Sequence, residues 1–92
     1  MQEAQQAQQA REDSRQESVE RGRSWAAACP VPLLEELHRY ELQRHDEDLE
    51  TQRLGRANLR AFSQRHISGG IASNAFVEGA LEVFRARRSP GR

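Results

Sequence analysis

The chain of 92 residues contains no lysine and only one cysteine, Cys29, and these two shortages exclude several kinds of chemistry. Without lysine there is no Schiff-base nucleophile and no lysine to hold a nucleotide phosphate in a P-loop. A single cysteine cannot form a disulfide within the chain, which predicts a reducing, cytoplasmic environment. Because no histidine or other base lies near Cys29 in the sequence, we interpret its side chain as a small buried apolar group.

Aromatic residues and long apolar stretches are also scarce. Only 5% of the residues are aromatic and 36% are hydrophobic, many of them alanine, whereas 30% are charged. No apolar run approaches the roughly 18 residues that a transmembrane helix needs, and the N-terminal residues resemble neither a signal peptide nor a transit peptide. We therefore expect no membrane contact, and a core so small that a partner or a second copy would help to stabilise it.

Charge is balanced over the whole chain but not along it. Fourteen arginines offset fourteen acids, so no global field attracts nucleic acid or an anionic membrane. Residues 35–50 hold seven acids and two arginines, whereas residues 51–66 hold four arginines and no acid. A helix favours acids near its N-terminus and bases near its C-terminus, so this order is typical of one continuous helix.

Hydrophobic periodicity predicts an all-α fold with two main helices. The longer one covers residues 33–66, which contain no proline, and its apolar residues return to one face at 33–40 and again at 54–62. We favour a single long helix here. The alternative is a break around residues 43–48, where Asp46 could cap a second helix.

The second predicted helix covers residues 71–88 and is the most clearly amphipathic segment. Its apolar residues recur at every fourth position: Ala72, Phe76, Ala80 and Phe84. Packed against the 54–62 end of the long helix, it would form an antiparallel hairpin.

The Ser68-Gly69-Gly70 sequence between these helices predicts a corner. Glycine readily adopts the left-handed conformation that ends a helix, so we expect Gly69 or Gly70 to end the first one. Ser68 or Ser73 would then cap the second.

The two ends of the chain are polar. Residues 1–24 hold little apolar surface beyond alanine and Val19, so we predict a disordered or fraying helical arm in which nothing buries a face. Residues 25–88 would form a single small helical domain, and residues 89–92 a flexible basic tail. Trp25 stands where the arm meets the domain, either as a lid on the protein's own core or as an anchor for another protein, and we favour the lid.

No pattern in the sequence indicates a catalytic, cofactor or metal site. The residues His38, Glu41, His45 and Asp48 fall along one side of a continuous helix, but no second cluster elsewhere would complete a metal site. We interpret Glu41 and His45 as an exposed ion pair. The sequence therefore predicts a protein that is not an enzyme and carries no cofactor.

These exclusions favour a non-catalytic protein–protein interaction module, such as a small adaptor, an assembly subunit or an inhibitor. The C-terminal helix reaches the 54–62 end of the apolar stripe more easily than the 33–40 end. The contact residues predicted for a partner are Trp25, Leu33, Leu37 and Tyr40. We also expect an antiparallel homodimer, in which acidic residues 35–50 of one chain face basic residues 51–66 of the other.

The alternative hypothesis is a small helix-turn-helix-like regulator that binds nucleic acid. Its contacts would come from arginines of the 53–65 segment and the C-terminal tail: Arg53, Arg56, Arg60, Arg65, Arg87 and Arg88. The helix that would read the bases offers Glu78 and Glu82 but no arginine before Arg85, which disfavours this hypothesis because acids would face phosphates.

Overall fold

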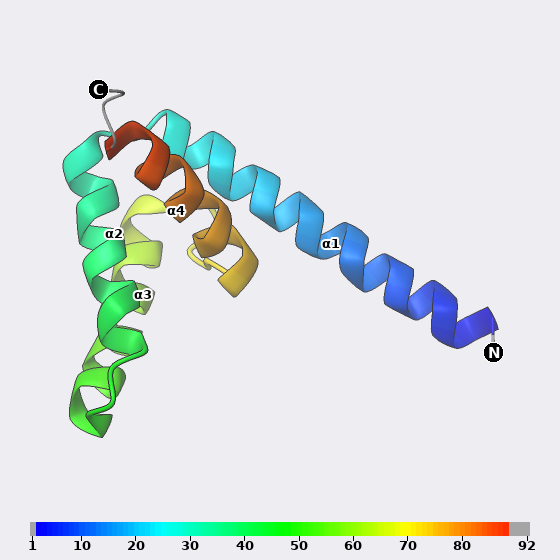
Figure 1. The fold of residues 1–92 in the computed structure, drawn as a ribbon, viewed down its shortest axis with the longest axis horizontal. Helices are drawn as coiled ribbons and strands as arrows, with labels where there is room; N and C mark the ends of the chain where they lie inside the picture. Colours follow the sequence, from blue (N-terminus) through cyan, green and yellow to red (C-terminus); the bar gives the residue numbers. More distant parts are fainter. Residues whose placement is uncertain (1, 89–92) are drawn as a thin grey trace.

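The protein forms four helices, in a computed structural model that describes the backbone of residues 2–88 and the side chains of residues 14–88. They are α1 (Gln2–Ala27), α2 (Val31–Arg44), α3 (Leu49–His66) and α4 (Asn74–Arg88), shown in Figure 1. The described residues contain no strand, which confirms the all-α prediction. None of the described helices is long and apolar enough to cross a membrane. The predicted tail, residues 89–92, lies outside the described part of the chain.

The single helix predicted for residues 33–66 is wrong, because the chain turns at residues 45–48 and α3 runs back along α2. Asp48 caps α3: its Oδ2 accepts hydrogen bonds from the Thr51 amide at 3.0 Å and the Thr51 hydroxyl at 2.8 Å. The Asp48 amide in turn donates a hydrogen bond to the Asp46 Oδ1 at 2.8 Å. Short acidic side chains satisfy free amides at a helix start better than they suit a helix interior, which favours the break.

The predicted hairpin of the 33–66 and 71–88 segments is also wrong, because the antiparallel hairpin consists of α2 and α3. Gly55 of α3 lies against the backbone of α2 so closely that a Cβ there would come within 2.5 Å of the Arg44 nitrogen. The Asn58 amide donates to the Gln43 Oε1 at 3.2 Å, also across the hairpin. A helix interior tolerates glycine at a cost, and here the glycine permits close packing of two backbones.

The fourth helix packs mainly against α1 rather than α3. Where they meet, a Cβ on Gly22 of α1 would overlap the carbonyl of Phe76, and a Cβ on Gly79 of α4 would overlap the carbonyl of Val19. Ion pairs flank the contact, from Arg15 to Glu78 at 2.6 Å and from Arg23 to Glu82 at 2.9 Å.

The α1 contact also corrects the prediction for residues 1–24. Of the two conformations predicted there, the described residues adopt the helical one, and α1 extends away from the other helices toward its N-terminus in Figure 1. The expectation that nothing in this segment buries a face is wrong, because Val19 is only 3% exposed and Gly22 is buried. Burial here arises from the close approach of two backbones and needs no large side chain.

All four helices contribute to one core, whose largest fully buried side chains are Leu34, Leu37, Phe62 and Phe84. Trp25 covers this core, as predicted for a lid. Its ring lies edge-on to the ring of Phe62, with the two ring centroids 6.0 Å apart. The centroid of the Phe76 ring is 5.6 Å from that of Trp25. Its Nε1–H donates to the carbonyl of His66 at 3.1 Å, so the indole also fixes the C-terminus of α3.

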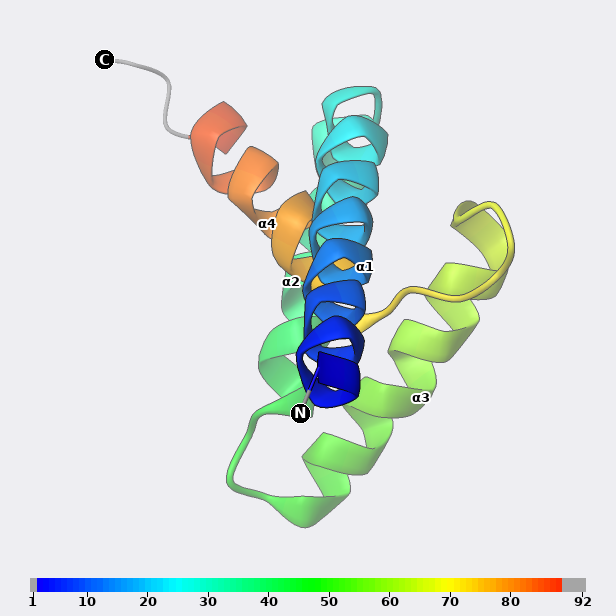
Figure 2. The ribbon, with the colours of Figure 1, turned by 90° about the vertical axis from the view of Figure 1, so that its right-hand side faces the viewer.

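The chain turns at Ser68-Gly69-Gly70 as predicted, but neither glycine ends the first helix: α3 ends at His66, and its C-cap is Ile67 in an extended conformation. Gly69 and Gly70 have φ angles of 90° and 73°, in the region that favours glycine. Ser73 then caps α4, since its Oγ accepts from the Phe76 amide at 3.2 Å. The connection of residues 67–73 is long enough for α4 to turn away from α3 and cross α1, as Figure 2 shows.

Cys29 is buried beside the end of α1, which agrees with its interpretation as a small apolar group. Burial raises the pKa of its thiol, and the charge of Arg87 offsets only part of this effect. The Arg87 guanidinium donates to the Ala26 carbonyl at 2.8 Å and to the Cys29 carbonyl, so it caps the C-terminus of α1.

We expect Gly22→Ala and Gly79→Ala each to lower the free energy of unfolding by about 1–3 kcal/mol, because the added methyl overlaps an opposing backbone carbonyl. In a free helix the same change would be favourable by up to about 1 kcal/mol. The sign of the effect, measured by urea denaturation, therefore tests the contact. Ser24→Ala, on the exposed side of α1, is the control and should leave stability unchanged or slightly raised.

We expect iodoacetamide to alkylate Cys29 at least about tenfold more slowly in the native protein than in urea, because the thiolate is the reactive form and burial disfavours it. Mass spectrometry of timed aliquots at pH 8 measures both rates. Equal rates would mean that the end of α1 is open.

Candidate interaction groove between α3 and α4

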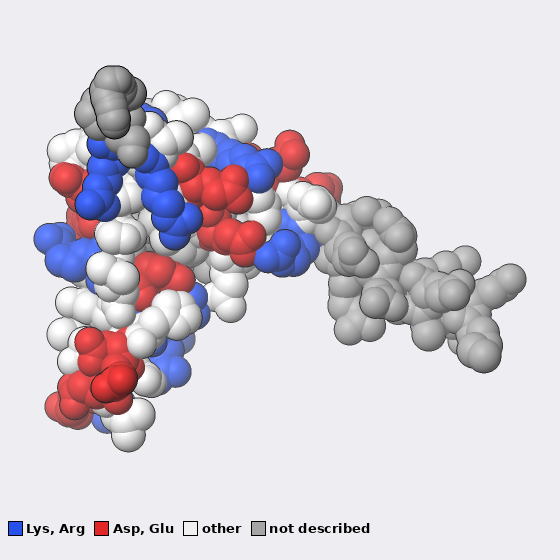
Figure 3. Space-filling view, in the orientation of Figure 1, with Lys and Arg blue, Asp and Glu red and all other residues white. Residues whose placement is uncertain are grey.

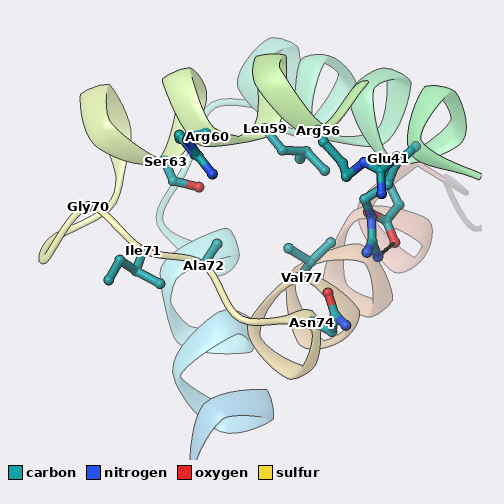
Figure 4. Close-up of a pocket in the computed structure, with 11 residues that line it drawn as sticks. Glu41, Arg56, Leu59, Arg60, Ser63, Gly70, Ile71, Ala72, Asn74 and Val77 are labelled. Carbon is teal, nitrogen blue, oxygen red and sulfur yellow. Dashed lines mark hydrogen bonds and ion pairs between the residues drawn. The ribbon is translucent and has the colours of Figure 1, made fainter. Parts of the chain in front are cut away.

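A groove of about 410 Å³ runs between α3 and the segment from Gly70 to Val77, and Figure 4 shows the residues that line it. We call it the α3–α4 groove. Its lining residues are Glu41, Arg44, Arg56, Leu59, Arg60, Ser63, Gly70, Ile71, Ala72, Asn74 and Val77. The groove exists because α3 packs on α2 while α4 packs on α1, so the two helices do not close on each other.

The floor and one wall of the groove are apolar. Val77 is buried and Leu59 and Ala72 are half-buried, so they form its base. Ile71 is 81% exposed, the highest value for any large apolar side chain in the described residues. An exposed isoleucine beside an apolar cavity is the arrangement that a binding partner covers.

The charges at the groove are predominantly positive. Arg56 and Arg60 project from α3, are exposed, and make no ion pair with any side chain that the structure describes. The one acid in the lining, Glu41, is held by Arg44 through two hydrogen bonds of 2.9 and 2.7 Å. This bonding raises the pKa of Arg44. Glu41 is therefore neutralised within the chain, and the two free arginines determine the charge that a ligand meets.

At the opposite end of α3 lies a surface of the reverse charge, which we call the hairpin tip. It combines exposed acids with exposed leucines: Asp46, Glu47, Asp48, Glu50, Leu42, Leu49 and Leu54. Figure 3 shows the acids gathered at the end of the molecule where α2 turns into α3. The three leucines are among the four large apolar side chains that are exposed in the described residues, so this surface is also suited to contact.

The four predicted partner contacts face the protein's own core. Leu37 is fully enclosed, with 0% exposure, while Trp25, Leu33 and Tyr40 are half-buried against the core. The Tyr40 hydroxyl donates to Glu36 at 2.8 Å, which raises the tyrosine pKa and holds the ring in place. Helix α4 packs against α2, which carries three of these residues, so part of the patch is covered within the chain. A contact role for the three half-buried residues stays a prediction.

The arginines of the nucleic-acid hypothesis do not form one surface. Arg53, Arg56, Arg60 and Arg65 are all exposed on α3. Arg87, in contrast, caps α1, and the guanidinium of Arg88 lies 5.5 Å from the centroid of the Phe84 ring.

The helix expected to read bases is partly covered. Its acids Glu78 and Glu82 are paired with arginines of α1, so α1 occupies the side of α4 that carries them. This arrangement differs from a helix-turn-helix, in which the reading helix projects into solvent.

Sequence reasoning missed the α3–α4 groove, although two signals for it are present. Ile71 follows two glycines immediately, in a segment where a large apolar residue has few neighbours to cover it. The second signal is the glycines inside the helical segments, at positions 22, 55 and 79, which indicate close contacts between helices. These contacts join α4 to α1 and α3 to α2, so α3 and α4 do not pack closely on each other.

Neither a metal-binding cluster nor a similarity to known proteins gives further information about the α3–α4 groove. Among the side chains of residues 14–88, no group of three or more His, Cys, Asp or Glu residues could hold a metal, and Glu41 and His45 form only a 3.2 Å pair. Comparison of the chain with family models, curated proteins and solved structures finds no match.

We expect Ile71→Glu to change the free energy of unfolding by no more than about 0.5 kcal/mol, since the side chain is exposed. Leu37→Ala should cost about 2–5 kcal/mol, because it empties an enclosed core position. Urea denaturation of both variants measures the difference. A large loss for Ile71→Glu would mean that this side chain belongs to the core and not to an open surface.

Proposed function

We propose that this protein is a non-catalytic interaction module that holds another protein in the α3–α4 groove. The observation that carries the proposal is the position of Ile71, exposed at the edge of an apolar groove with two arginines that no described side chain pairs. A groove between two helices accepts apolar side chains of a partner, while the arginines select an acidic one. Roles of this kind include an adaptor, an assembly subunit and an inhibitor.

The chemistry of the groove supports binding rather than catalysis. Its polar groups are two arginines, an ion pair, Ser63 and Asn74, and none of them is a nucleophile beside a base. The buried free thiol of Cys29 fits a reducing compartment, so we place the protein in the cytoplasm.

A second candidate function, backbone binding to nucleic acid, is favoured by one observation. Arg53, Arg56 and Arg60 recur at intervals of three and four residues on the exposed surface of α3. Opposing it, the acids of the hairpin tip lie beside Arg53 near the start of α3 and would repel phosphates.

We expect a photo-crosslinking residue at position 71 to capture a protein in the cells that make this chain, because the groove edge would lie against the partner. The same residue at Ser24, exposed on α1, is the control and should capture little. Irradiation followed by mass spectrometry identifies the adducts. Adducts equally frequent at both positions would contradict the proposal.

The same experiment separates the two functions through Arg56→Glu/Arg60→Glu. For protein binding in the groove, this double variant should lose the crosslink from position 71. Adducts of nucleic acid, released by nuclease treatment and found only with the arginines intact, would favour the second candidate instead.

A further inference from the structure

We propose that the occupant of the α3–α4 groove is the hairpin tip of a second copy of this chain. This inference rests on the proposed function and names its partner. The tip and the groove occur on the same molecule and complement each other in both charge and apolar character, so two copies can satisfy each other.

The charges of the two surfaces match in kind. The groove presents Arg56 and Arg60, which have no ion-pair partner among the described side chains. At the tip, Glu47 and Glu50 are exposed and likewise make no ion pair there, unlike Asp48, which is occupied in capping α3. Two free arginines on one surface and two free glutamates on the other supply an attraction that guides the tip to the groove.

The apolar parts also correspond. Leu49 is 73% exposed, so it offers a side chain that a partner could cover. Leu59, Ile71 and Val77 form an apolar groove that could receive it. Insertion would cover Ile71 and Leu49 together, which removes the two most exposed large apolar side chains of the described residues from water.

The positions of the two surfaces permit a reciprocal contact. Both are carried by α3, with Glu50 at its start and Arg60 ten residues later, about 15 Å along the helix at 1.5 Å per residue. Leu49 precedes Arg56 by seven residues, or about two helical turns, so the two side chains share one face of α3, and a two-fold axis across this face sets each tip against the groove of the other copy. Such a contact is closed, so association stops at a dimer.

This dimer retains the charge pairing expected from the sequence but not its geometry. Acidic residues before position 51 still face basic residues after it on the other chain. The sequence-based pairing assumed a continuous helix over residues 33–66, and the structure has the α2–α3 hairpin in its place.

Sedimentation velocity over a range of protein concentrations tests the inference with the full chain. We expect a reversible monomer–dimer equilibrium whose dissociation constant rises several-fold between about 0.05 and 0.5 M salt, because exposed ion pairs are screened. A chain that stays monomeric at every concentration would overturn the inference.

A charge exchange tests the surfaces themselves. Arg56→Glu/Arg60→Glu makes the groove acidic, and Glu47→Arg/Glu50→Arg makes the tip basic, so each variant alone should dimerise at least about tenfold more weakly. Mixed in equal amounts, the two should form a heterodimer, since the acidic groove now meets the basic tip and the unchanged pair also matches. A misfolded variant would not be rescued in this way.

The control is Arg39→Glu/Arg65→Glu, which alters the net charge by the same amount at exposed positions outside the groove. It should dimerise like the original chain. Equal weakening by the control, or no heterodimer in the mixture, would contradict the tip-to-groove contact. A monomeric chain that still captures a different protein from position 71 would end this inference and leave the proposed function intact.

Discussion

The close contact of α1 and α4 at Gly22 and Gly79 is the constraint on which the rest of the structure depends. Each glycine lies where a Cβ would overlap a carbonyl of the opposing helix, so the two backbones meet with no side chain between them. Ion pairs from Arg15 and Arg23 to the acids of α4 add orientation at the margins. Because α4 packs mainly against α1, its apolar side chains enter the core from the side on which α1 lies.

The consequence for α3 is that it must pack elsewhere. It turns back along α2 through a four-residue connection capped by Asp48, with Gly55 against the backbone of α2. Two tightly packed helix pairs thus share one core through Phe62, Phe84 and the leucines of α2. The side of α3 that faces α4 is left open, and this opening is the groove.

The same turn separates the charges of the chain in space. Acids that would have continued along one helix gather at the hairpin tip, whereas the arginines of α3 line the groove. Within the chain, Glu41 is paired with Arg44, and the acids of α4 are paired with arginines of α1. Among the described side chains, the groove keeps two arginines without an ion pair and the tip keeps two such glutamates, and both proposals rest on this division.

The sequence by itself determined the helical fold, the amphipathic α4, the glycine corner with its Ser73 cap, the buried thiol and the lid formed by Trp25. The helices, the amphipathic face of α4 and the Ser73 cap depend on neighbours within one or two helical turns, which periodicity and capping residues report directly. The Trp25 lid and the buried thiol involve residues far along the chain, and their burial was predicted from residue type alone. Only the tertiary structure decided the break at residues 45–48, the partner of each helix and the groove. Apolar spacing says which face of a helix is buried but not against which helix. The partner of each helix depended on how closely two backbones can approach. Three glycines in helix interiors allow this close approach, and the hydrophobic pattern does not reveal it.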